Sequence, residues 1–211
     1  MKYYPVFLNM QSKKVVIIGG GTVAERKAGT LLKAGARVTV VSPELTEKLG
    51  NLEQNKIIKH ISRGYRKNDI KDAFLVVAAT DSSDINTRVS RDARGLVNVV
   101  DLPSLCNFIA PSVITRGALT IAISTSGISP ALAKTIRKEL EKQYGTEITM
   151  YLKFLNGIRI RTLATIPEQS KREKFLKGLA SKKILQMLRV KGVQEVKKAV
   201  LGNLDKILNN T

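Results

Sequence analysis

The first half of the chain alternates short apolar runs with longer segments whose apolar residues repeat at helical spacing. The runs are rich in β-branched residues, and one that is apolar throughout is typical of a strand buried on both faces. The expected strands are 13–18, 37–41, 57–61, 74–79 and 96–100. Helical spacing is expected over 23–33 and 83–94. Strands separated by helix-length segments predict a parallel sheet in an α/β domain.

The pattern changes after residue 112. Two apolar segments, 112–115 and 119–124, are separated by Arg116-Gly117 and predict a hairpin. Ser129-Pro130 then opens a helix that runs to about Tyr144, with serine as its cap and proline at its first position. Beyond Thr146 only amphipathic helical stretches follow, at 148–165, 168–180, 182–188 and 193–208. We therefore expect an α/β domain over 1–112, a small α+β segment over 113–145 and a helical domain over 146–211.

Charge is the unusual feature of the composition. The 211 residues include 36 Lys and Arg against 17 Asp and Glu, a net charge of +19. Residues 113–211 hold 19 basic against 7 acidic residues, a net of +12, so the excess lies mostly in the second half. Such an excess fits an anionic partner, which could be nucleic acid, an anionic membrane or a polyanionic small molecule, or else a solvated basic surface. Composition alone leaves these alternatives open.

Targeting signals and metal-ligand patterns are missing from the sequence. No apolar run approaches the roughly 20 residues that span a bilayer, and the N-terminus lacks the apolar stretch of a signal peptide. The single cysteine, Cys106, cannot form an internal disulfide, which agrees with a reducing compartment. We therefore expect a cytoplasmic protein. No Cys, His, Asp and Glu cluster has metal-ligand spacing, so no bound metal is expected.

A glycine-rich turn joins the first strand to the first helix. In Gly19-x-Gly21-x-x-Ala24, the first glycine permits a tight turn, the second lets a pyrophosphate approach the backbone, and the small alanine lets helix and strand pack closely. The helix start adds unpaired N–H groups and a favourable dipole. The pattern predicts a dinucleotide site formed by Gly19, Gly21, Thr22, Val23 and Ala24. The alternative is a tight turn with a structural role only.

The second strand lacks the acidic residue that usually binds the ribose hydroxyls. It ends in Val41-Ser42-Pro43-Glu44, where Ser42 could bind a ribose hydroxyl, whereas Glu44 could lie one turn too late for this role. Arg37 lies too early in the strand to reach a 2′-phosphate, so we favour NAD over NADP as cofactor. Further cofactor contacts are expected from Ser42, Pro43 and Glu44, and from Thr80 after the fourth strand.

An ordered set of motifs over residues 3–140 resembles a known family. The motifs are Pro5-Val6-Phe7-Leu8, the run from Gly19-Gly20-Gly21 through Arg26-Lys27-Ala28, Ala78-Ala79-Thr80-Asp81, Asn86-x-x-Val89-Ser90, Asn98-Val99-Val100-Asp101, Phe108-Ile109-Ala110-Pro111-Ser112 and Ser124-Thr125-Ser126-Gly127-Ile128-Ser129-Pro130. Together they resemble the precorrin-2 dehydrogenase and sirohydrochlorin ferrochelatase family, the N-terminal module of siroheme synthases. The helical tail matches that family in character only.

The resemblance implies a fold, an assembly and an activity. It implies a Rossmann-type NAD-binding domain over 1–112, a dimerisation segment over 113–145, a helical domain over 146–211 and a homodimer. It implies removal of a hydride and a proton from the reduced tetrapyrrole precorrin-2, giving sirohydrochlorin. The catalytic aspartate of the family falls at Asp101, just past the fifth strand, where a carboxylate could accept the proton. The alternative for Asp101 is a turn or cap residue.

The resemblance also gives the basic charge a partner. Precorrin-2 carries eight carboxylates, so a basic protein matches it electrostatically. Ser124, Thr125 and Ser126 precede a helix start and could bind a substrate carboxylate or a cofactor phosphate. The alternative is a capped loop at the dimer seam. Asn98 is a further substrate-binding candidate, although an asparagine there could simply orient a loop.

Two other functions remain open. The first is a bifunctional enzyme that also inserts ferrous iron into sirohydrochlorin, and the scarcity of metal-ligand residues favours the dehydrogenase alone. The second is a redox-sensing regulator with a Rossmann domain and a basic DNA-binding domain. The basic helices lack a clear helix-turn-helix pattern, so nucleic acid is not the expected partner. No membrane is expected as a partner either, because no apolar run is long enough to span one.

Overall fold

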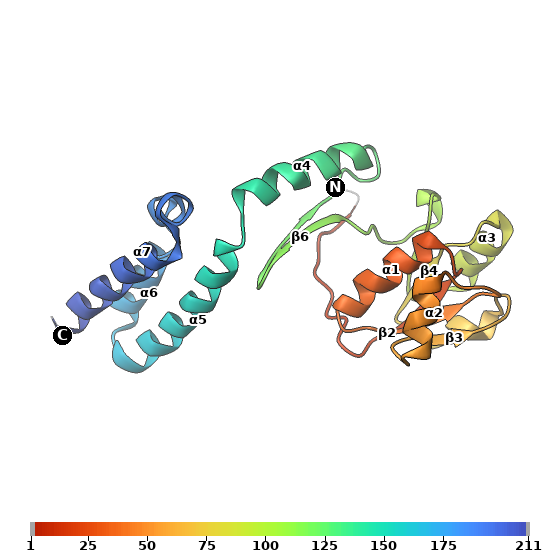
Figure 1. Cartoon of the computed structure of the whole chain (residues 1–211), viewed down its shortest axis with the longest axis horizontal. Coiled ribbons are helices and arrows are strands. Elements are labelled where there is room, and N and C mark those ends of the chain that lie inside the picture. Colours follow the sequence, from red (N-terminus) through yellow and green to blue (C-terminus); the bar gives the residue numbers. More distant parts are fainter. Residues whose placement is uncertain (1–2, 210–211) are drawn as a thin grey trace. The chain divides into compact units, whose positions relative to one another are not determined.

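Five strands form one parallel sheet in the first part of the chain, in a computed structural model that describes residues 3–209 (Figure 1). They are β1 (Lys14–Ile18), β2 (Arg37–Val41), β3 (Lys59–Ile61), β4 (Leu75–Ala78) and β5 (Leu96–Val99). The strand order is β3-β2-β1-β4-β5. The order reverses between β1 and β4, and ligands of open α/β sheets bind at such a switch point, outside the carboxyl ends of the strands. The expected α/β parallel fold is confirmed.

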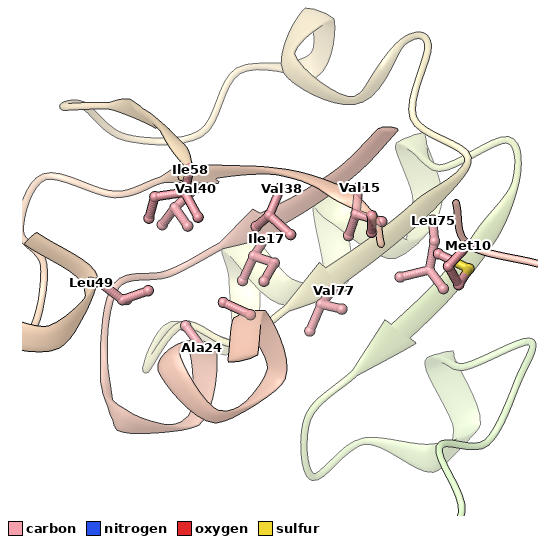
Figure 2. Packing of buried hydrophobic residues seen from close by; sticks show 12 residues of the cluster. Met10, Val15, Ile17, Ala24, Val38, Val40, Leu49, Ile58, Leu75 and Val77 are labelled. Carbon is pink, nitrogen blue, oxygen red and sulfur yellow. The ribbon is translucent and has the colours of Figure 1, made fainter. Parts of the chain in front are cut away.

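The sheet is buried on both faces because its strands are apolar at consecutive positions. Val15 and Ile17 face the cluster that includes Ala24 and Leu49 from the helices α1 (Thr22–Lys33) and α2 (Glu47–Gln54) (Figure 2). Val16 and Ile18 belong to a second cluster, which includes Val89 of α3 (Ser83–Asp92). Alternate residues therefore point to opposite faces, and both faces are apolar, as expected for a parallel sheet.

Two local features differ from the pattern-based prediction. The helix α2 was not expected, and β3 begins two residues later than predicted, at Lys59. Ile57 and Ile58 continue the turn after α2 instead, and the N–H of Ile57 donates to the carbonyl of Leu52 at 2.9 Å. A β-branched pair at the end of a short helix therefore looked like the start of a strand.

The rest of the chain forms a second compact unit, from Pro111 onward, while the first unit extends to Ala110. The second unit contains an antiparallel hairpin, β6 (Ser112–Arg116) and β7 (Leu119–Ile123). Four helices follow, α4 (Pro130–Gln143), α5 (Glu147–Thr165), α6 (Gln169–Gly178) and α7 (Lys182–Asn209). Gly192, with φ 80° and ψ 177°, interrupts α7 where the sequence pattern predicted a break. Among the described residues, none of the helices has the length and apolar character needed to cross a bilayer.

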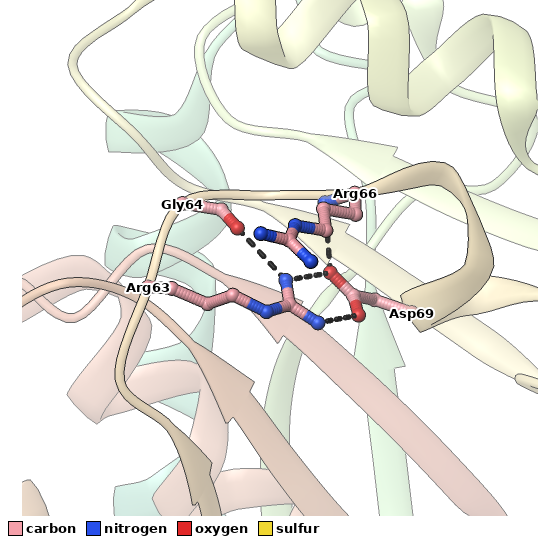
Figure 3. Close-up of polar contacts among 4 residues, drawn as sticks. All are labelled: Arg63, Gly64, Arg66 and Asp69. Carbon is pink, nitrogen blue, oxygen red and sulfur yellow. Dashed lines mark hydrogen bonds and ion pairs between the residues drawn. The ribbon is translucent and has the colours of Figure 1, made fainter.

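An aspartate and two arginines fix the segment after β3, and the short 3₁₀ helix η1 (Lys67–Ile70) lies within it (Figure 3). The guanidinium of Arg63 donates to both carboxylate oxygens of Asp69, at 2.9 and 2.7 Å, and the backbone N–H of Arg66 donates to the same carboxylate at 2.8 Å. The Asp69 side chain is only 5% exposed. The hydrogen bonds from Arg63 hold the pKa of Asp69 below its usual value of 3.8.

Asp69→Asn should lower the free energy of unfolding by about 1.5–3 kcal/mol at pH 7, because it removes charge-assisted hydrogen bonds and leaves Arg63 without its partner. The folded-state pKa of Asp69 lies below the unfolded value, so its contribution is complete above pH 3.8 and is lost as pH falls through the folded-state pKa. Urea denaturation followed by circular dichroism should therefore show a smaller difference from wild type in strong acid than at pH 7. Asp72→Asn, at an exposed aspartate nearby, should change little. An equal effect of both substitutions would contradict the assignment.

Candidate functional site

The register of the sheet brings four strand ends to one edge. Ile18 pairs with Val41 and with Ala78, and Ala78 pairs with Val99. The next residues continue the ladder: the N–H of Gly19 donates to Val41 at 2.9 Å, and that of Val100 donates to Ala78 at 2.9 Å. The predicted cofactor residues and Asp101 therefore lie along the same carboxyl edge of the first unit.

Three consecutive glycines form the turn between β1 and α1, and each has a different environment. A Cβ on Gly19, whose φ is +115°, would overlap the carbonyl oxygen of Ala79. A Cβ on Gly20 would overlap the carbonyl oxygen of Glu44. A Cβ on Gly21 would meet nothing within 4 Å. Packing thus requires the first two glycines, whereas the third leaves open space; the role of Gly20 was not predicted from the sequence.

The start of α1 fits a dinucleotide pyrophosphate. Gly21 is the N-cap residue of α1. Glycine has no side chain that could accept a hydrogen bond from the first N–H groups of the helix. Gly21 and Thr22 are exposed, Val23 is half-buried and Ala24 is fully buried between helix and sheet. Unpaired N–H groups beside open space at a helix N-terminus suit an anion. Gly21 leaves open space and Ala24 packs between helix and sheet, and the binding of a pyrophosphate here stays a prediction.

The segment after β2 lies against this glycine turn. Ser42 is buried, and its carbonyl oxygen lies 2.9 Å from the ring Nε2 of His60. The N–H of Thr46 donates to the carbonyl of Gly20 at 2.9 Å, while Pro43 and Glu44 are exposed. Glu44 is therefore an exposed acidic residue whose backbone carbonyl lies against Gly20, whereas Ser42, the residue closest to the strand end, is buried.

Thr80 is held in place by an asparagine of α3. The backbone N–H and the hydroxyl of Thr80 both donate to Oδ1 of Asn86, at 3.3 and 2.8 Å, and Nδ2 of Asn86 donates to the Thr80 carbonyl at 2.9 Å. Asn86 is only 5% exposed. Thr80 thus has a defined position at the end of β4, and the Asn86 amide determines it.

Asp101 lies two residues beyond β5, in an exposed turn. Its φ is +60°, a left-handed conformation that few non-glycine residues adopt and that Asp and Asn tolerate best. Backbone strain of this kind is concentrated at functional sites. The catalytic role of Asp101 stays a prediction.

The Cys106 side chain forms hydrogen bonds with the backbone of the turn that contains Asp101. The N–H of Val99 donates to the Cys106 sulfur at 3.1 Å, and the thiol lies 3.2 Å from the Val99 carbonyl and 3.4 Å from that of Leu102. The thiol therefore bonds the backbone on both sides of the turn. The sequence offered no signal for this role beyond the short separation between Asp101 and Cys106.

The Asn98 side chain, on β5, forms hydrogen bonds with α1 and with the segment that follows Asp101. Its Oδ1 accepts from the ammonium of Lys27 at 3.3 Å, and its Nδ2 donates to the carbonyl of Phe108 at 3.4 Å. Burial, followed by repulsion from Arg26, lowers the pKa of Lys27. Asn98 thus links α1 to the chain segment that follows Asp101, and Lys27, which was not among the predicted site residues, contacts this candidate residue.

The hydroxyl residues predicted to bind substrate lie in the second unit. The Ser124 hydroxyl oxygen accepts from the N–H of Ser126 at 3.1 Å, and the Thr125 hydroxyl oxygen accepts from the N–H of Ser129 at 3.0 Å. The Ser129 hydroxyl in turn caps α4 at Leu132. These bonds define the loop. Because the loop belongs to another unit than Asp101, a site shared by the two stays a prediction.

Across residues 3–209, no three or more His, Cys, Asp and Glu side chains are grouped so that they could hold a metal ion.

Two family models match this chain, each over a different part of it. Residues 6–112 match the family described as putative NAD(P)-binding, and residues 116–143 match the family described as sirohaem biosynthesis protein central. The siroheme synthase of Thioalkalivibrio sulfidiphilus is 40% identical over 182 residues, which cover 85% of this chain and 37% of that protein. The siroheme synthase of Actinobacillus succinogenes is 34% identical over 209 residues, covering 98% and 44%. The chain thus spans about two fifths of the length of these relatives.

A solved structure resembles the whole chain. The protein named SirC, precorrin-2 dehydrogenase, superposes with a TM-score of 0.80 at 28% identity, covering 95% of this chain and all of that one. The family match extends over both the glycine turn and the Asp101 turn, and the structural match includes the second unit. The chain therefore belongs to the putative NAD(P)-binding family, within the group that siroheme synthases and the precorrin-2 dehydrogenase SirC represent.

Proposed function

We propose that this protein oxidises precorrin-2 to sirohydrochlorin with NAD. The observation that carries the proposal is the position of the glycine turn and of Asp101 on one carboxyl edge, at the switch point of the sheet. The likeness to SirC over 95% of the chain supports the choice of substrate. Relatives called siroheme synthases support the same pathway.

Different residues bind the cofactor and act on the substrate. When bound, NAD supplies the acceptor for a hydride. The helix start at Gly21 to Ala24 binds the pyrophosphate, and Ser42, Pro43 and Glu44, which follow β2 at the same edge of the sheet, bind the adenosine ribose. Thr80 lines the same edge. Asp101 accepts the proton that the tetrapyrrole loses together with the hydride, so that sirohydrochlorin, NADH and one proton are formed.

The substrate contacts and the domain roles complete the proposal. Asn98 and the loop Ser124, Thr125 and Ser126 bind the tetrapyrrole, whose eight carboxylates suit a protein of net charge +19. Residues 1–112 bind NAD, 113–145 form the dimer contact and 146–211 form a helical domain. The protein works in the cytoplasm, where reducing conditions keep the Cys106 thiol available for its bonds to the Asp101 turn.

Anaerobic incubation with precorrin-2 and NAD tests the proposal. NADH absorbance should rise in step with the appearance of sirohydrochlorin, and omission of either reactant should abolish the change. No NADH formation by the folded protein would refute the function. A parallel incubation with sirohydrochlorin and ferrous iron tests the bifunctional alternative, and we expect no increase over the uncatalysed rate of iron insertion.

Glu44→Gln should raise the NAD dissociation constant about five- to tenfold, the value of one or two hydrogen bonds of about 1 kcal/mol. The reason is that an amide replaces the exposed carboxylate beside the glycine turn. Isothermal titration with NAD measures the change. Glu47→Gln, at an exposed glutamate in the first turn of α2, is the matched control and should leave the affinity within about twofold. Equal affinities for Glu44→Gln and wild type would assign ribose binding elsewhere.

The assembly prediction concerns the hairpin. Isolated two-stranded units are marginal in water, and Val113 of β6 and Leu132 of α4 are 43% and 51% exposed in the single chain. Pairing with a second copy would cover such residues, so we expect a symmetric dimer. Light scattering at micromolar concentration should give twice the chain mass of 23.2 kDa. A species of single-chain mass alone would contradict the dimer.

A further inference from the structure

A groove with an apolar floor lies between α6 and α7 of the second unit. Its volume is about 480 Å³, within the range of small-molecule sites. Phe175 and Leu179 from α6 and its end, and Val200 from α7, line it and are all buried. Lys171, Lys174 and Lys206 line it as well, and all three lysines are exposed. Apolar and cationic groups thus share one concave surface.

A buried hydrogen bond and core packing fix the position of the groove floor. The hydroxyl of Tyr151, on α5, donates to the carbonyl of Leu179 at 2.7 Å inside the helical core. Burial raises the pKa of Tyr151 to about 12, so this donor keeps its proton at physiological pH. Leu179 and Val200 also belong to the core cluster of this unit. The groove is therefore a feature of the packed helices.

The positive charge around the groove is incompletely neutralised. Lys171 pairs with Glu168 at 2.9 Å, and Asp205, next to Lys206 in the chain, is 3.6 Å from the guanidinium of Arg161. Within residues 3–209, neither Lys174 nor Lys206 forms an ion pair. Two uncompensated ammonium groups beside an apolar floor favour a ligand that has both an apolar body and more than one negative charge.

We propose that this groove is a second binding site for tetrapyrrole polycarboxylates, which holds substrate or product on the helical unit. The inference rests on the proposed function, which supplies a ligand of this class. The flat face of the macrocycle would cover Phe175 and Leu179, and peripheral carboxylates would pair with Lys174 and Lys206. A fatty acid also has an apolar body but only one carboxylate, so it matches the charge of the groove less well.

Uroporphyrin tests the site, because it is a fluorescent tetrapyrrole with eight carboxylates. Lys174→Glu and Lys206→Glu in the full chain should each raise its dissociation constant about tenfold, since attraction becomes repulsion beside the floor. Gly178→Leu fills the groove without changing charge, because a Cβ on Gly178 meets nothing within 4 Å, and it should weaken binding similarly. Lys183→Glu and Gly157→Leu are matched controls outside the groove, and both should bind like wild type.

Amine-reactive labelling followed by mass spectrometry locates the probe independently of any variant. Uroporphyrin should protect Lys174 and Lys206 of the wild-type chain and leave Lys183 unprotected. Unchanged affinity in all three groove variants, or no protection of Lys174 and Lys206, would overturn the site. Displacement of uroporphyrin by dodecanoate at equal concentration would also overturn it, because one carboxylate would then be enough.

The precorrin-2 assay separates this inference from the proposed function. If wild type forms NADH from precorrin-2 but the groove variants bind uroporphyrin normally, the groove proposal fails and the function stands. If wild type forms no NADH but the groove variants lose uroporphyrin affinity and labelling protection, the function fails and the groove stands as a polycarboxylate site.

Discussion

Asp101→Asn should lower the turnover of precorrin-2 by about 10²–10⁴, the loss typical when a general base is removed. The NAD cofactor takes only the hydride, so the proton needs another acceptor. Asparagine keeps the size of the side chain and also tolerates the left-handed φ of +60° at this position. The backbone turn should therefore survive, and the change should isolate the basicity of the carboxylate.

Steady-state kinetics with NADH detection measure this prediction. The turnover should fall while KM barely moves, because the interaction is made mainly in the transition state. NAD affinity should stay near wild type, since the glycine turn follows β1 and not β5. Asp72→Asn, an exposed aspartate before β4, is the matched control and should keep full activity. Near wild-type turnover in Asp101→Asn would make this aspartate a turn residue and send the proton to solvent or another group.

Gly21→Val should raise the NAD dissociation constant at least tenfold, or about 1.4 kcal/mol, without unfolding the protein. The branched side chain would occupy the open space that the pyrophosphate needs, since a Cβ there meets nothing within 4 Å. Gly21 has φ −81° and ψ −173°, an extended conformation that suits valine. The melting temperature should therefore change little while the affinity falls.

A substitution at the neighbouring Gly20 serves as a comparison, because it should lower the stability of the fold, which Gly21→Val should leave unchanged. Gly20→Ala should cost about 1–3 kcal/mol of stability, because its Cβ overlaps the backbone carbonyl of Glu44 and the chain must shift. Gly29→Val, inside α1 with open space around it, should leave NAD affinity within about twofold. Isothermal titration and thermal denaturation of the three variants measure both effects. Unchanged NAD affinity in folded Gly21→Val would exclude this turn as the pyrophosphate site.

Periodicity was sufficient to predict most of the fold, because each strand and helix carries its own local signal. Residues 15–18 of β1 are apolar at every position, which is typical of a buried parallel strand, and Ser129-Pro130 marks the start of α4 through capping chemistry alone. The glycine pattern after β1 also depends on local geometry. The short helix α2 was missed because its eight residues carry too few apolar repeats, and the β-branched pair Ile57-Ile58 in the turn after it resembled the start of a strand.

Contacts between residues distant in the chain could not be predicted in this way. That Gly20 needs to be glycine depends on the carbonyl of Glu44, and the position of Asp101 depends on a thiol that spans its turn. The Lys27 ammonium reaches Asn98 across 71 positions of sequence. Packing places these groups together only once the sheet has formed.

Local sequence patterns were thus enough to predict the α/β class, the order of most elements and the glycine turn, because period, capping and turn chemistry act between near neighbours. Asp101 became a candidate through the family resemblance and its place after the fifth strand. The folded structure was needed to learn that Ser42 is buried while Glu44 is exposed, that Asn98 bonds to protein groups, and that lysines line an apolar groove between α6 and α7. Burial and partnership are set by what packs against a side chain, and the residues that do so come from distant parts of the chain.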